Sequence, residues 1–96
     1  MLLSVDEIKK LLQKWHFYNA LVSEQENNEL LRKLRAIEKA VSLLNDVSKR
    51  IIQMKYFQGY EMNVVAKSVF ISRRAAYYRI ETSLKEISYI TANLSL

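Results

Sequence analysis

The residues with the clearest chemical potential lie in the last quarter of the chain. Arg73 and Arg74 directly follow Ser72, and the run Tyr77-Tyr78-Arg79 comes one helical turn later. A guanidinium group can bond bidentately to the O6 and N7 atoms of guanine or to phosphate oxygens, and a tyrosine ring can pack on a thymine methyl group. This pattern therefore indicates contact with nucleic acid.

Other site chemistries have little support in the sequence. His16 is the only histidine and there is no cysteine, so zinc would lack its usual ligands. Gly59 is the only glycine, which excludes a glycine-rich phosphate loop. We expect no enzymatic activity, no metal site and no cofactor.

Length and composition set the elements that must position these side chains. Ninety-six residues suffice for one compact unit, and with no proline and one glycine the chain suits uninterrupted helices rather than hairpins. The opening residues lack a basic leader region, and no uncharged run approaches the length of a membrane span. We therefore expect an all-α, cytoplasmic protein that does not associate with membranes.

The net charge of +5 is unevenly distributed. Residues 1–44 carry seven Lys and Arg against six Asp and Glu, whereas residues 45–96 carry eight against four. A basic second half favours a polyanionic partner, nucleic acid before an acidic membrane, although solubility alone explains many basic chains.

Apolar periodicity predicts a pair of helices in the first half, over about residues 5–21 and 27–44. The second of them carries an apolar stripe with alternating spacings of four and three, formed by Leu30, Leu34, Ile37, Val41 and Leu44. The stripe spans about two heptads, which is short for a coiled coil, so packing inside the chain is favoured. Support or dimerisation of the second half is the predicted role of residues 1–44, with a homodimer through this stripe as the alternative to internal packing.

Three shorter helical signals follow, which makes about five helices in all. Asp46 can cap a third helix that ends where Gly59 takes a left-handed conformation, and a short fourth helix runs from Met62 to Val69. Ser72 can cap a fifth helix, whose inward residues would be Ala76, Ile80, Leu84 and Ile87. Residues 45–96 thus form the predicted DNA-binding part.

The fourth and fifth helices fit a helix-turn-helix. This unit needs a small residue where the two helices touch and apolar residues that flank the turn. Ala66 and Ala76 supply the small residues, and Val69 and Ile71 flank the turn. The spacing is moderately specific, because other pairs of small amphipathic helices also show it.

The run from Lys49 to Ala66, followed by Ile71-Ser72, resembles region 4 of bacterial sigma-70-type factors. The run Tyr77-Tyr78-Arg79-Ile80 with Leu84-Lys85-Glu86-Ile87 is further similar to the small phage late-transcription regulators of the ArpU and RinA kind. The resemblance covers about residues 44–87. It implies sequence-specific binding of duplex DNA and transcription regulation in a phage or mobile element.

Two residues depart from the family pattern. Phe70 stands where the family usually has Gly or Asn, so either a bulky residue accepts an unfavourable φ or the turn is built differently. Glu61 replaces the usual Ser or Thr cap, so we expect a loosely started fourth helix. Residues 1–43 lack the signature of sigma region 2, so the chain is not a complete sigma factor.

A helical wheel separates the predicted contacts into two sets. The outward residues at the start of the fifth helix are expected to read bases: Arg73, Arg74, Tyr78 and Glu81. The second set is expected to contact the DNA backbone, namely Lys49, Lys55, Lys67, Ser72, Tyr77, Arg79 and Lys85. For Tyr77, which lies nearer the core face, a half-buried packing role is favoured over a DNA contact.

The alternative function is a helical adaptor that binds RNA polymerase or another regulator through the same surface. The outer face of the fifth helix discriminates between the two, because its cations favour DNA whereas the tyrosine pair suits either partner.

Overall fold

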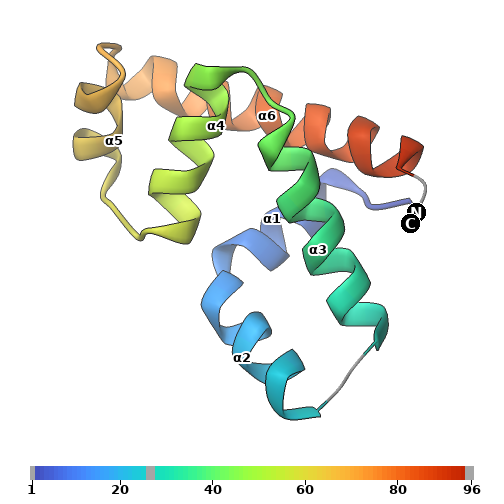
Figure 1. Cartoon of the computed structure of the whole chain (residues 1–96). Coiled ribbons are helices and arrows are strands. Elements are labelled where there is room, and N and C mark those ends of the chain that lie inside the picture. Colours follow the sequence, from blue (N-terminus) through green and yellow to red (C-terminus); the bar gives the residue numbers. More distant parts are fainter. Residues whose placement is uncertain (1, 26–27, 95–96) are drawn as a thin grey trace.

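The computed structural model describes residues 2–25 and 28–94, and every regular element in this part of the chain is helical (Figure 1). The all-α prediction is confirmed. The elements are α1 (Val5–Gln13), α2 (Trp15–Gln25), α3 (Asn28–Ser42), α4 (Asp46–Ile52), the π-helical turn η1 (Gln53–Phe57), α5 (Met62–Ser68) and α6 (Arg73–Asn93).

The helix predicted over residues 5–21 is in fact two helices. Lys14 leaves the helical conformation, with φ −119° and ψ 37°, and α2 starts in a new direction at the next residue. The new direction brings the buried Trp15 ring onto Phe57, with the ring centroids 4.7 Å apart. This contact links residues more than 40 positions apart, so helical periodicity alone could not predict the break.

The apolar stripe of α3 is used inside the chain. Leu34, Ile37 and Val41 are at most 1% exposed and Leu44 is 5% exposed, while Leu30 is partly buried against the same core. These five side chains therefore do not form a surface on which a second chain can pack. Internal packing, the favoured alternative, is what the structure shows.

The ends of the α4–η1 segment follow the sequence prediction, except that the N-cap lies one residue earlier than predicted. Asn45, not Asp46, caps α4, because its side-chain oxygen accepts a hydrogen bond from the Ser48 N–H at 2.9 Å. After α4 the chain widens into η1, where the Gln58 N–H reaches the carbonyl of Gln53. Gly59 then takes the predicted left-handed conformation, with φ +77°.

Both halves of the chain share one core. The long helix α6 packs on α1, α3, α4 and α5, and residues from Leu3 to Ile87 belong to a single apolar cluster. In Figure 1, α6 runs behind α4 from the α5 end of the molecule to the opposite end. The Ser88 hydroxyl also donates a hydrogen bond to the Leu3 carbonyl at 2.6 Å. From the first half of the chain, α1 and α3 therefore hold α6 in place.

An ion pair joins α1 to α3 at the surface. The Lys33 ammonium lies 2.7 Å from the Glu7 carboxylate and 3.7 Å from that of Glu29. The hydrogen bond that Lys33 donates to the Glu7 carboxylate raises the pKa of Lys33 above its usual 10.5, against a smaller opposing effect of burial.

Candidate nucleic-acid interface

The turn between α5 and α6 has a defined hydrogen-bond pattern. The Ile71 N–H bonds to the Ala66 carbonyl and the Phe70 N–H to the Lys67 carbonyl, which is the Schellman arrangement at a helix end. Phe70 occupies the left-handed position of this motif with φ +59°. Of the two alternatives for Phe70, the structure shows the first: a bulky residue in an unfavourable conformation.

The start of α6 is built as the sequence predicts. The Ser72 hydroxyl accepts a hydrogen bond from the Ala75 N–H at 3.0 Å, which caps the helix and orients its first turn. The inward residues Ala76, Ile80, Leu84 and Ile87 are all buried. At the start of α5, Glu61 is the N-cap and makes no side-chain capping bond.

All four residues predicted to read bases are exposed on α6: Arg73, Arg74, Tyr78 and Glu81. The Tyr78 side chain is 68% exposed. Among the described residues, Arg73 and Arg74 form no ion pair. Both guanidinium groups are therefore available to an external anion.

Tyr77 combines packing with exposure. Its ring is 44% exposed, and the Arg73 guanidinium lies 5.7 Å from the ring centroid, in the range of a cation–π contact. The ring therefore supports Arg73 at the tip of the helix.

A polar depression of about 350 Å³ lies between η1, the start of α5 and the start of α6. Lys55, Arg73 and Tyr77 line it, so the structure brings together two residues predicted to contact the DNA backbone and one predicted to read bases. Glu61, Met62 and Asn63 line it as well, and the sequence analysis placed none of them in the site; Asn63 is the added residue that can donate a hydrogen bond. Its only signal was its place near the start of α5, whose angle to α6 the sequence does not specify.

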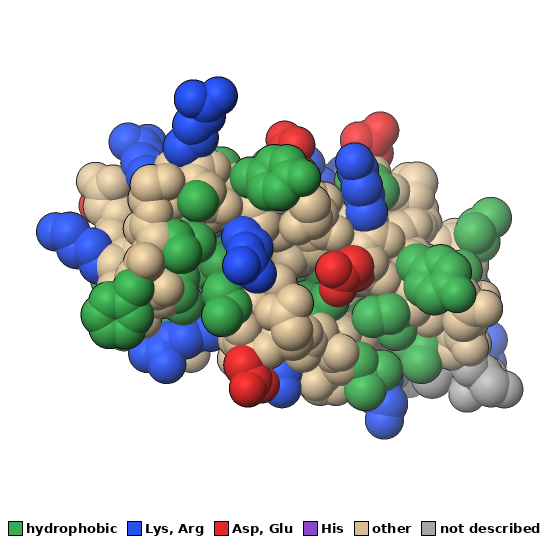
Figure 2. All heavy atoms as spheres, turned by 90° about the horizontal axis from the view of Figure 1, so that it is seen from above, with side chains coloured by type: hydrophobic (Ala, Val, Ile, Leu, Met, Phe, Trp, Pro, Cys, Tyr) green, Lys and Arg blue, Asp and Glu red, His purple; other side chains and the backbone are tan. Residues whose placement is uncertain are grey.

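The remaining predicted backbone residues are spread over several elements. Lys67 and Ser72 are exposed at the two sides of the turn, whereas Lys49 on α4 and Arg79 on α6 are partly buried. Lys85 is exposed farther along α6, where it lines a shallow depression with Tyr89 and Ile90. Figure 2, which views the molecule from above the orientation of Figure 1, shows Lys and Arg side chains around the α5 end, with hydrophobic side chains between them.

The remaining features that the sequence raised are His16, metal ligands and membrane spans. The His16 ring is exposed, and its Nε2 donates a hydrogen bond to the Phe57 carbonyl at 2.8 Å. Within residues 2–25 and 28–94, no three His, Asp or Glu side chains are grouped so as to hold a metal ion. No helix in these same ranges has the length and apolar character needed to cross a bilayer.

Comparison of the chain with protein-family models, with curated proteins and with solved structures gives no match.

Proposed function

We propose that this chain binds duplex DNA through the outer face of α6. The observation that carries the proposal is the pair Arg73 and Arg74, which is exposed at the tip of a capped helix and free of ion pairs within the described chain. An exposed helix of this kind fits the width of the major groove. The opposite face of α6 is buried, so the helix has one orientation in which to present these groups.

Each contacting side chain has a specific task in this arrangement. Arg74, with Arg73 at the helix tip, bonds to guanine edges, and the Tyr78 ring packs against a thymine methyl group. Lys55 and Lys67, from η1 and α5, contact phosphate oxygens on the flanking backbone. The resemblance over residues 44–87 extends the proposal to transcription regulation in a phage or mobile element.

The second candidate is the adaptor function, which exposed apolar side chains on α5 and in the segments on either side of it favour. Phe70 is 94% exposed, and Tyr60 and Val64 are each nearly half exposed. Rings of this kind bind proteins readily, and RNA polymerase is the partner that the resemblance implies. These side chains lie outside α6, so they extend the shared surface of the adaptor prediction beyond the tyrosine pair of α6.

Selection of bound sequences from a random duplex pool tests the DNA proposal. We expect enrichment of a site with at least one guanine that Arg74 contacts, and an affinity that falls steeply as salt rises. Absence of enrichment, together with no retention on random duplex at low salt, would refute it. Retention of the chain by purified RNA polymerase in that case would favour the adaptor.

A further inference from the structure

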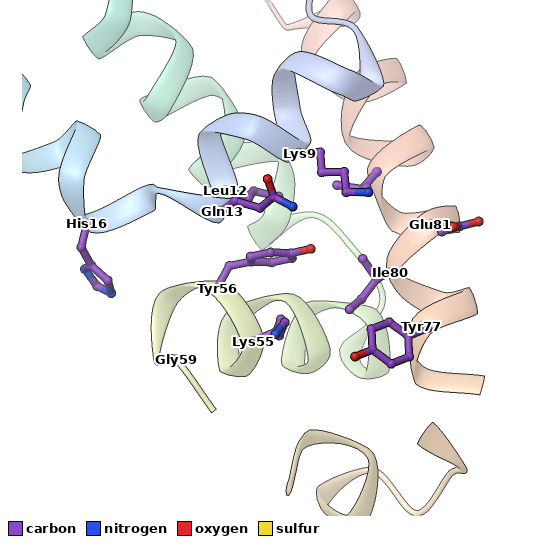
Figure 3. Close-up of a pocket in the computed structure, with 11 residues that line it drawn as sticks. Lys9, Leu12, Gln13, His16, Lys55, Tyr56, Gly59, Tyr77, Ile80 and Glu81 are labelled. Carbon is purple, nitrogen blue, oxygen red and sulfur yellow. The ribbon is translucent and has the colours of Figure 1, made fainter. Parts of the chain in front are cut away.

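A second and larger pocket lies beside the proposed DNA-binding face. Its volume is about 540 Å³, within the range of small-molecule sites. Its walls come from α1 and the start of α2, from η1 and the following Gly59, and from α6 (Figure 3). The pocket therefore joins the N-terminal helices to the helix that is proposed to read DNA.

The lining divides into apolar and polar parts. Leu12, Ile80 and Leu84 form an apolar floor, and the rings of Tyr56 and Tyr77 provide flat walls. Figure 3 shows the Tyr56 ring in the middle of the group, with Lys9 on one side of it and Lys55 on the other.

The charge of the lining favours an anion. Lys9 and Lys55 contribute two positive charges, whereas Glu81 contributes the one carboxylate, which points away from the tyrosine rings in Figure 3. Burial raises the pKa of Tyr56 above its usual 10.0, so its hydroxyl stays protonated and can donate a hydrogen bond.

From this lining we infer that the pocket binds a small planar aromatic carboxylate. The ring of the ligand would lie beside the Tyr56 ring above the apolar floor, and its carboxylate would pair with Lys9, on one side of that ring. A DNA backbone would satisfy the two cations but not the apolar floor, which is why a small aromatic acid fits better.

Occupancy of the pocket should lower the affinity for DNA. Lys55 and Tyr77 line both this pocket and the depression on the proposed DNA-binding face, so a bound carboxylate would place a negative charge close to a cation that a phosphate needs. This regulatory consequence rests on the proposed function, whereas binding of the ligand to the free chain does not.

Calorimetric titration of the free protein with 1-naphthoate and with the neutral 1-naphthylmethanol tests the site. We expect naphthoate to bind about tenfold more tightly than the alcohol, the effect of one charge-assisted hydrogen bond. The Lys9→Gln variant should lose that preference. Lys10→Gln is the matched control, because it makes the same charge change at an exposed residue that lines a different depression.

Absence of naphthoate binding, equal binding of the acid and the alcohol, or equal effects of the two lysine variants would each overturn the inference. DNA affinity is then measured with and without naphthoate. A fall in the parent but not in Lys9→Gln supports the regulatory consequence, and an unchanged affinity in the parent overturns it. If the free chain binds naphthoate but no duplex, the proposed function fails while the pocket stands.

Discussion

At the scale of single residues, two positions take positive φ: a glycine, which adopts this conformation without strain, and a phenylalanine, which does not. Gly59 adopts φ +77° with nothing within 4 Å of the place where a Cβ would stand. Phe70 adopts φ +59° although its side chain is 94% exposed and packs on almost nothing. A left-handed conformation costs a non-glycine residue about 1–2 kcal/mol, so Phe70 lowers the stability of the turn without a compensating contact.

Replacement of Phe70 by glycine should therefore stabilise the protein. We expect Phe70→Gly to raise the free energy of unfolding by about 1 kcal/mol, because the strain disappears and little packing is lost. Urea denaturation followed by circular dichroism measures the change. A loss of stability would show that the ring makes contacts that its exposure does not reveal.

Gly59→Ala tests the opposite change, in which a residue with a Cβ is placed at a positive φ. There is room for the added methyl group, so only the backbone conformation opposes it, and we expect a loss of about 1 kcal/mol in the same denaturation assay. An unchanged midpoint would mean that the segment after η1 relaxes to a negative φ at little cost.

At the scale of helices, the stripe of α3 holds the core of one chain. Ile37 is fully buried, and its truncation in Ile37→Ala should cost about 2–5 kcal/mol. Because the contacts lie within one chain, the change in melting temperature should not depend on protein concentration. A cost that grows as the protein is diluted would instead indicate that the stripe joins two chains.

The Lys33 ion pair makes a pH-dependent link between α1 and α3. The pKa of Lys33 is raised in the folded state, so the contribution of the ion pair to stability is full below pH 10.5. That contribution is lost as the pH rises through the raised pKa. The melting temperatures of the parent and of Lys33→Gln should differ at neutral pH and converge at higher pH. Lys39→Gln, exposed on the same helix, should show no such convergence.

Much of the secondary structure was predictable because it depends on neighbours in the sequence. Ser72 caps α6 and Gly59 turns left-handed, as their residue types indicate. The break at Lys14 was not predictable, since it depends on the distant contact between Trp15 and Phe57. For the same reason the exposed arginines of α6 were predictable from the sequence. Asn63 was not, because its place in the site depends on the angle between α5 and α6.

At the scale of the whole molecule, the salt dependence of DNA affinity should distinguish residues that contact phosphates from residues that read bases. Lys67→Ala removes an exposed cation of α5 and should weaken binding to all duplexes alike. The slope of log affinity against log salt should fall by about one unit. A loss confined to one sequence would place Lys67 at a base instead of a phosphate.

The central claim is that α6 reads duplex DNA with Arg74, and one comparison tests it most directly. Affinities of the parent, Arg74→Ala and Arg32→Ala for the selected duplex and for a scrambled duplex are measured by fluorescence anisotropy at one salt concentration. Arg32 is exposed on α3 and provides the same charge change outside the proposed interface. We predict that Arg74→Ala loses about 1–3 kcal/mol of affinity for the selected duplex and most of its preference over the scrambled one, whereas Arg32→Ala keeps that preference. Equal small losses in both variants, with the sequence preference intact, would contradict the claim that this face of α6 reads DNA.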